Sequence, residues 1–143
     1  MTAAEILKNN GLNRTHCRVL VLEQLMNNPG ALSQSELDEM LRPLCNRSTL
    51  YRILNILEKH RLILRIALED GNRFFFDESM TTDPHANDSF IFFHCTRCNN
   101  LLPLKQEEQQ RITVPQGFVI TEQRFLVRGT CKKCNQEKYT IKI

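Results

Sequence analysis

Four of the six cysteines stand in two Cys-x-x-Cys pairs, a spacing that metal sites use. The first pair is Cys95 and Cys98, and the second is Cys131 and Cys134. Two residues between cysteines let both thiolates reach one ion, and two such pairs complete the tetrahedron that zinc prefers. Four thiolates leave no open position for water, so the pattern predicts one structural zinc per chain rather than a catalytic one. An iron centre and a redox dithiol pair are the alternatives.

The other two cysteines have no such spacing. Cys17 falls on the apolar side of an expected helix, and Cys45 falls in a turn. The chain has no apolar run of the ~20 residues that a membrane helix needs and no signal-peptide layout at its start. We therefore expect a cytoplasmic protein without a membrane segment, in which both thiols stay reduced and form no disulfide. Cys17 is expected to act as a small hydrophobic side chain in the core, and Cys45 is left without an assigned role.

The N-terminal half has the signals of four helices and a hairpin. Helices are expected at 3–9, at 15–27, after the Ser33/Glu36 capping box, and at 46–60 behind an Asn46 or Ser48 cap. Alternating apolar residues around an Asp-Gly pair predict a hairpin over 62–76. This layout is typical of a winged helix-turn-helix, whose last helix enters the major groove of DNA. The alternative is an α+β domain in which that helix carries an ordinary solvated face.

The charge is only mildly basic, at +3, but basic residues concentrate between positions 47 and 73. The helix at 46–60 has one apolar stripe, which leaves other positions free to face DNA. The candidate contacts to bases are Arg47, Thr49, Tyr51 and Arg52, and the candidate contacts to phosphates are Arg14, Arg18, Arg61, Arg65 and Arg73.

The C-terminal half begins after a polar stretch. Residues 78–88 contain almost no apolar side chains, so we place a linker there, between domains at 1–77 and 89–143. Strand signals follow at 89–94, 100–105, 117–121 and 124–129, with a short polar helix expected near 106–112. The predicted fold class is α+β, with an N-terminal winged helix-turn-helix domain and a small C-terminal α/β domain that carries the four-cysteine zinc site.

Several motifs come in one specific order: Thr15-x-x-Arg18, Ser33-x-x-Glu36-Leu37, Ser48-Thr49-Leu50-Tyr51-Arg52-x-Leu54 and the two Cys-x-x-Cys pairs. This order and spacing resembles the ferric uptake regulator family over nearly the whole chain. The resemblance implies a homodimeric transcriptional regulator with a C-terminal dimerisation domain, a tetramer remaining possible. It also implies Tyr51 and Arg52 as recognition contacts and the four cysteines as zinc ligands. We expect a repressor that binds a palindromic operator in double-stranded DNA.

The sequence departs from the family where metal is sensed. Sensing members carry His-x-His just before the first cysteine pair, and this chain has Phe90 and Phe92 there. Of the other positions where the family places sensing ligands, only Asp77 and Glu107 have suitable side chains. A phenyl ring cannot coordinate a divalent ion. We therefore expect that the structural zinc is kept, that the usual second, sensing metal site is lost, and that the two rings pack as apolar side chains.

Other readings remain open. A metal-responsive repressor for iron, zinc or manganese could use non-standard ligands, with Asp77, His85, His94 and Glu107 as the candidate second site and Asp83 and Asp88 nearby. The four-cysteine zinc could instead be a redox sensor. A scaffold that binds only protein would show no salt-dependent DNA binding. An enzyme is not expected, because neither a Ser-His-Asp order, a phosphate loop nor a thioredoxin-like context is present.

Overall fold

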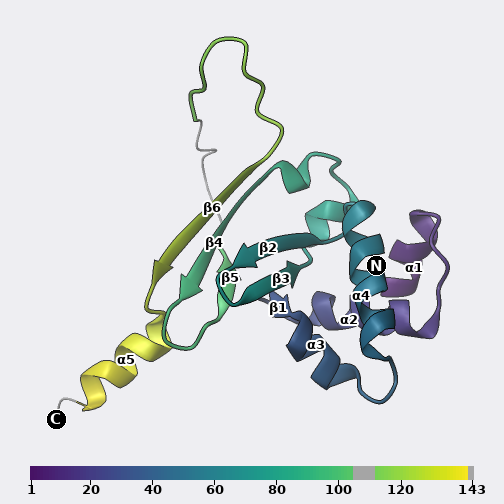
Figure 1. The fold of residues 1–143 in the computed structure, drawn as a ribbon, viewed down its shortest axis with the longest axis horizontal. Coiled ribbons are helices and arrows are strands. Elements are labelled where there is room, and N and C mark those ends of the chain that lie inside the picture. Colours follow the sequence, from purple (N-terminus) through teal and green to yellow (C-terminus); the bar gives the residue numbers. More distant parts are fainter. Residues whose placement is uncertain (105–111, 142–143) are drawn as a thin grey trace. The chain divides into compact units, whose positions relative to one another are not determined.

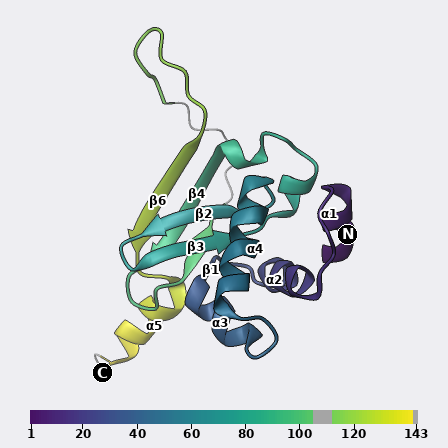
Figure 2. The same cartoon turned by 45° about the vertical axis from the view of Figure 1, so that its right-hand side comes forward.

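The computed structural model describes residues 1–104 and 112–141 and divides the chain into two compact units, Met1–Ala86 and Asn87–Ile143 (Figures 1 and 2). The stretch predicted as a linker, 78–88, holds two short 3-10 helices, η1 (Glu78–Thr81) and η2 (Ala86–Asp88). In the part of the chain that is described, no helix combines the length and the apolar character needed to cross a membrane.

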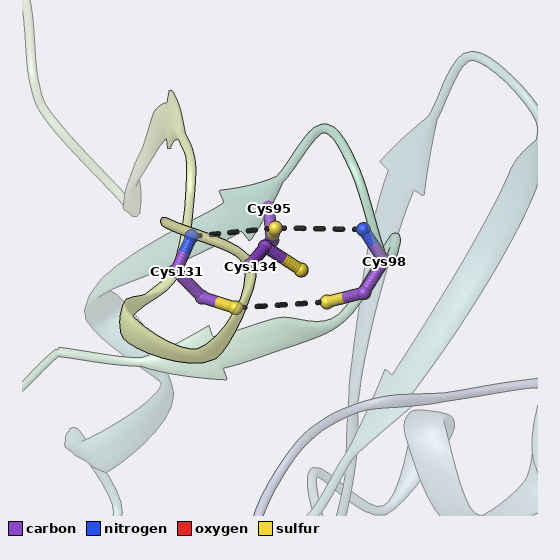
Figure 3. A group of neighbouring side chains, drawn as sticks. All are labelled: Cys95, Cys98, Cys131 and Cys134. Carbon is purple, nitrogen blue, oxygen red and sulfur yellow. Dashed lines mark hydrogen bonds between the residues drawn. The ribbon is translucent and has the colours of Figure 1, made fainter. Parts of the chain in front are cut away.

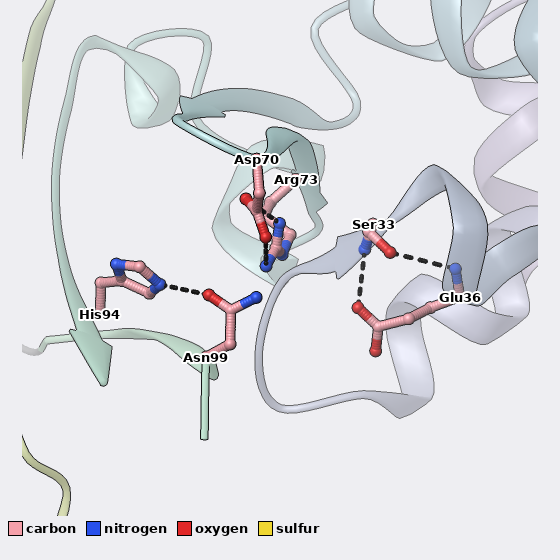
Figure 4. A network of polar contacts seen from close by, with 6 residues as sticks. All are labelled: Ser33, Glu36, Asp70, Arg73, His94 and Asn99. Carbon is pink, nitrogen blue, oxygen red and sulfur yellow. Dashed lines mark hydrogen bonds and ion pairs between the residues drawn. The ribbon is translucent and has the colours of Figure 1, made fainter. Parts of the chain in front are cut away.

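Four helices form the first unit: α1 (Ala3–Asn9), α2 (His16–Asn27), α3 (Gln34–Leu41) and α4 (Arg47–Lys59). Each begins behind a polar side chain that accepts a hydrogen bond from a backbone N–H of the first turn, which fixes where the helix starts. The capping box predicted at Ser33 and Glu36 is present (Figure 4). Asn46, and not Ser48, caps α4, since its Oδ1 accepts from the N–H of Thr49 at 2.8 Å.

A three-stranded antiparallel sheet completes this unit. The predicted hairpin consists of β2 (Leu64–Leu68) and β3 (Gly71–Phe75), which pair in register around the Asp-Gly turn. Gly71 has a φ of 127°, a conformation that glycine adopts without strain. A two-residue strand that the sequence analysis did not predict, β1 (Leu32–Ser33), adds to the outer edge of β3.

The apolar stripe of α4 faces the core of the first unit. Its four members are all buried, and they belong to a cluster that also takes side chains from α1, α2, α3 and the hairpin. Fully burying each such side chain stabilises the fold by ~1.5–3 kcal/mol. The stripe consists of Leu50, Ile53, Leu54 and Leu57. The packing of this stripe holds α4 in place and leaves its opposite face outside the core.

Cys17 and Cys45 form a disulfide, with their Cα atoms 5.8 Å apart. Cys17 packs against the core cluster, as the sequence analysis predicted, and Cys45 is a buried member of that cluster, which was not predicted. The expectation that they stay unbonded thiols was wrong. It rested on the reducing compartment and on the lack of a local motif, and 28 residues separate the two positions along the chain.

A buried carboxylate near the end of α3 makes the stability of this unit depend on pH. Asp38 is 3% exposed, and Arg42 donates to its Oδ2 from Nε at 3.1 Å and from Nη2 at 2.5 Å. The hydrogen bond from Arg42 lowers the pKa of Asp38 below its usual 3.8. Asp38 therefore stabilises the fold above pH 3.8, and this contribution disappears as the pH falls through the lowered pKa.

Asp38→Asn is expected to lower the urea midpoint at neutral pH, because the neutral amide loses the charge-assisted bond to Arg42. The deficit should shrink as the pH falls below 3.8, where the wild type loses the same charge. Urea unfolding of both proteins at a series of pH values measures this. A deficit of constant size at every pH would contradict the assignment.

The second unit contains β4 (Ser89–Cys95), β5 (Leu101–Pro103), β6 (Gln123–Gly129) and α5 (Lys132–Ile141). Strand β4 is central, antiparallel to β5 and parallel to β6. The predicted strand at 117–121 was wrong: these residues lie outside any strand, and Phe118 and Val119 are 67% and 86% exposed. Helix α5 was not predicted. Most of the helix expected near 106–112 lies outside the described residues.

Candidate metal centre and nucleic-acid interface

The register of β4 and β6 brings the two cysteine pairs together. Cys95 ends β4 and lies opposite Gly129, near the end of β6 and two residues before Cys131. Cys98 follows in the turn after β4, and Cys134 is the third residue of α5. The four Sγ atoms lie within 4.8 Å of one another (Figure 3). This quartet brings together all four ligands that the spacing predicted.

The dimensions of the quartet fit a tetrahedral metal ion. With metal–sulfur bonds of about 2.3 Å, two sulfurs of a zinc tetrahedron lie about 3.8 Å apart. The Sγ atoms of Cys98 and Cys131 are 3.8 Å apart. Because four thiolates close the coordination sphere, an ion held here would stabilise the fold and would not activate water.

Backbone N–H groups point at one sulfur of the quartet. Cys98 and Cys131 donate to Cys95 Sγ at 3.5 and 3.3 Å, and these bonds lower the pKa of Cys95 to about 5. The neighbouring Cys131 side chain, together with burial, raises the pKa of Cys134 to about 12. Cys95 is therefore ready to bind a cation as a thiolate, whereas a metal must displace the proton of Cys134.

A basic side chain between the two cysteines of the first pair is hydrogen-bonded to the backbone of the second pair. Arg97 Nη1 donates to the carbonyl oxygen of Cys134 at 3.5 Å, which links the turn after β4 to α5. Arg97, Lys132 and Lys133 all lie between the cysteines of a pair. Their charges offset the net −2 of four thiolates around a divalent ion.

Helix α4 presents a polar face opposite its buried stripe. Arg47, Tyr51 and Arg52 are exposed, Tyr51 by 51%, and Thr49 is half-buried in the first turn. Arg47 and Tyr51 are four residues apart and share one side of the helix. A helix with a basic and aromatic N-terminal half of this kind can present donors to base edges and to phosphates.

Two arginines of the hairpin have partners within the first unit. Arg73 is 4% exposed, and its Nη1 and Nη2 donate to the carboxylate of Asp70 at 3.1 and 3.2 Å (Figure 4). The prediction of Arg73 as a phosphate contact is not retained, because a buried and paired guanidinium cannot reach DNA. Arg65 donates to Asn55 at 2.6 Å, pairs with Glu58 at 2.7 Å and lies 5.3 Å from the ring centre of Phe74.

Arg65 therefore ties the hairpin to α4, a role that the sequence analysis missed, since no local pattern signals a contact between residues ten positions apart. The remaining phosphate candidates lie nearer the surface. Arg14 and Arg61 are exposed, and Arg18 is half-buried with Nη1 donating to the carbonyl of Asn13 at 3.3 Å.

The sequence model of the ferric uptake regulator family matches residues 9–128 of the chain. The chain belongs to this family. Its curated relatives include the ferric uptake regulation protein of Campylobacter jejuni, with 26% identity over 97% of the chain and 90% of that protein. Members of the family are metal-responsive transcription regulators and not enzymes.

Solved structures of ferric uptake regulators and their relatives share the fold. The Helicobacter pylori ferric uptake regulator, described as having three functional metal-binding sites, covers 94% of the chain and 95% of its own length, with 22% identity and a TM-score of 0.61. A zinc uptake regulator in complex with zinc and DNA covers 94% of the chain and 91% of its own length, with 20% identity and a TM-score of 0.69.

The aromatic pair that departs from the ferric uptake regulator pattern is packed. The rings of Phe90 and Phe92 stack with centroids 5.8 Å apart and planes 20° from parallel. Phe92 is buried and Phe90 is half-buried. The two side chains share one face of β4, as alternation along a strand predicts. Aromatic contacts therefore occupy this face of β4.

The candidate ligands for a second metal belong to both units, with Asp77 and His85 in the first and His94 in the second. Asp77 caps η1 and accepts from the N–H and hydroxyl of Ser79, and His85 N–H donates to Asp83 at 2.9 Å. His94 Nε2 lies 2.6 Å from Asn99 Oδ1 (Figure 4). Glu107 lies outside the described residues. Within residues 1–104 and 112–141, the cysteine quartet is the one group of three or more potential ligands close enough to share an ion.

Proposed function

We propose that the chain is a sequence-specific, DNA-binding transcription regulator that acts as a homodimer and represses from a palindromic operator. The observation that carries this is the division of α4, whose apolar stripe is buried while Arg47, Tyr51 and Arg52 are exposed. The zinc uptake regulator solved with zinc and DNA shares the fold, which supports DNA as the partner of this chain. Arg14, Arg18, Arg61 and Arg65 remain the proposed phosphate contacts. Exposed apolar side chains in the second unit, such as Phe118 and Leu126, are available to a second copy of the chain or to a tetramer.

Binding to DNA is tested with duplexes at several salt concentrations. We expect tight binding to an operator selected from a random library, and a salt slope of about −0.9 per phosphate contact. Fluorescence anisotropy with the selected duplex and a scrambled one measures both. Absence of salt-dependent binding to any duplex would favour the protein-only scaffold and would contradict the proposal.

The proposed resident metal is one structural zinc ion per chain, held by Cys95, Cys98, Cys131 and Cys134. The fit of the 3.8 Å sulfur separation to a zinc tetrahedron supports this identity, and so does the all-thiolate ligand set. Zinc supplies no redox chemistry and acts here as a cross-link between β4 and α5. The chain itself would supply all four ligands, each a cysteine sulfur.

The proposal includes the loss of the usual sensing site. Stacked Phe90 and Phe92 support it, because neither ring can replace an imidazole as a ligand. The competing function is a metal-controlled repressor that uses Asp77, His85, His94 or Glu107. It would resemble the Helicobacter pylori regulator, which is described as having three functional metal-binding sites, in having more than one such site. A redox response of the quartet, with oxidation ejecting zinc, is the other competitor.

Elemental analysis separates these functions. Purified protein is incubated with excess zinc, iron(II) or manganese(II) and then desalted. We expect tight binding of about one zinc per chain and no second equivalent, because the quartet alone supplies a full ligand set. A second tightly held ion, lost in Asp77→Ala or His94→Ala, would show that a sensing site has been rebuilt. The matched control is Glu78→Ala, which removes an exposed carboxylate of the same region that is not among the candidate ligands.

A further inference from the structure

The two cysteines outside the quartet lie near the N-termini of α2 and α4. Cys17 is the second residue of α2, and Cys45 directly precedes Asn46, the N-cap of α4. The N–H of Cys45 donates to the carbonyl of Leu41 at 3.0 Å, so Cys45 is also tied to the end of α3. The disulfide therefore joins α2 to the point where α4 begins.

We propose that Cys17 and Cys45 are a reversible redox site that controls how firmly the N-terminus of α4 is held. When the bond is closed, the segment before α4 is covalently fixed to α2. When it is open, this segment is held by hydrogen bonds and packing alone. The effect on DNA, which rests on the proposed function, follows because Arg47 and Thr49 lie directly after this segment.

The local structure accommodates both states. The Cα separation of 5.8 Å is within the range that an unstrained bridge requires. Cys17 Sγ lies 3.4 Å from the carbonyl oxygen of Leu44, so a Cys17 thiol would have an acceptor in place. Cys45 is 3% exposed and Cys17 is half-buried, so Cys17 is the sulfur that a small oxidant can reach first. The first turn of a helix also favours negative charge.

A hydroperoxide is the class of oxidant that this arrangement suits. The Cys17 sulfur attacks the peroxide, forming an S–O bond and breaking the O–O bond, and one alcohol or water molecule leaves. Cys45 then attacks the sulfenic sulfur, so that the S–S bond forms, the S–O bond breaks and a second water leaves with the proton of Cys45. Two thiols lose two electrons in total, and the peroxide gains them. A dithiol reductant reverses the reaction by two exchange steps.

The closed bond should raise DNA affinity. A regulator that orders the N-terminus of its recognition helix on binding loses conformational freedom, and a segment fixed in advance loses less. The described structure carries the disulfide together with an intact cap on α4, so closing the bond does not distort the helix. We expect the oxidised protein to bind its operator roughly 3- to 10-fold more tightly than the reduced protein.

The test uses the full chain in its zinc-loaded form, reduced with a dithiol or treated with a small excess of hydrogen peroxide. Peptide mapping after alkylation should find Cys17 linked to Cys45 in the treated sample. Amide hydrogen exchange at residues 47–50 should slow by roughly 10- to 400-fold, the upper value being the one expected for a cross-link that closes a loop of this length. Zinc content, measured in the same samples, should not change.

Cys17→Ser is the matched control, because it removes the bond and leaves the quartet and the buried Cys45 in place. Peroxide should change neither exchange nor DNA binding in this variant. An equal response in Cys17→Ser, or zinc loss that tracks the response, would assign redox sensitivity to the quartet and overturn the proposal. Absence of the link, or unchanged exchange at 47–50, would also overturn it. A closed bond with slowed exchange but no DNA binding in either state would support the redox site and reject the proposed function.

Discussion

Cys95→Ser is expected to abolish tight zinc binding and to unfold residues 87–143, while residues 1–86 keep their fold. Cys95 is 1% exposed and accepts two backbone hydrogen bonds within the quartet. A structural zinc contributes ~10–16 kcal/mol of binding free energy that is available only to the folded state. The second unit is small, and a unit of this size rarely has more than ~3–5 kcal/mol of its own stability. The free energy lost with the zinc therefore exceeds the stability that the second unit has on its own.

Elemental analysis and amide hydrogen exchange measure the two parts of this prediction. Protection should disappear from β4, β5 and β6 and remain in α2 and α4. Wild-type protein stripped by a strong chelator should match the variant, and Cys17→Ser should keep both its zinc and its protected second unit. If metal-free wild-type protein kept full protection in β4, the quartet would not be the structural centre of this unit.

Arg52→Ala is expected to weaken operator binding by ~1–3 kcal/mol, or about 5- to 150-fold in Kd, and to relax sequence preference. Arg52 is exposed on α4, opposite the buried stripe, and a guanidinium that donates twice to one base gives discrimination as well as affinity. Loss of such a pair of hydrogen bonds leaves the rest of the interface intact, so the affinity for scrambled DNA should fall much less.

Lys59→Ala is the matched control on the same helix. Lys59 is the exposed last residue of α4, about 10 Å further along the helix axis than Arg52. Its loss should weaken binding to all duplexes slightly and equally, through the electrostatic attraction to phosphates. Anisotropy titrations on operator and scrambled duplexes compare the variants. An equal loss on both duplexes for Arg52→Ala would place Arg52 on the phosphate backbone instead of on a base.

Local signals predicted most of the first unit. Thr15, Ser33 and Asn46 mark helix starts within one turn of sequence, and the Asp70-Gly71 turn fixes the hairpin. The spacing of each cysteine pair likewise predicts a four-residue turn that brings both sulfurs of the pair to one side. These features were predictable because the residues that cause them are neighbours in the chain.

The features that were missed depend on distant contacts. The Cys17–Cys45 bond joins positions that are 28 apart in the sequence, and no motif near either cysteine indicates its partner. Arg73 was predicted as a surface charge because its burial depends on how the sheet packs, although its partner Asp70 is only three residues away in the sequence. The strand expected at 117–121 has apolar residues suited to pairing, but no strand among the described residues pairs with it. A segment forms a strand only when it can pair with the edge of another strand, and the local sequence does not show whether such an edge lies beside it.

The parallel pairing of β4 with β6 sets the order in which the protein can mature. Cys95 and Cys134 are nearly 40 positions apart, and a parallel pair cannot be closed by a tight turn. The ribosome must therefore release the chain through Cys134 before the quartet exists, whereas the locally connected helices of residues 1–86 can fold earlier during synthesis. All four sulfurs could hold an ion only after this step. A chain truncated before Cys131 would contain the helices of residues 1–86 but would lack half of the quartet.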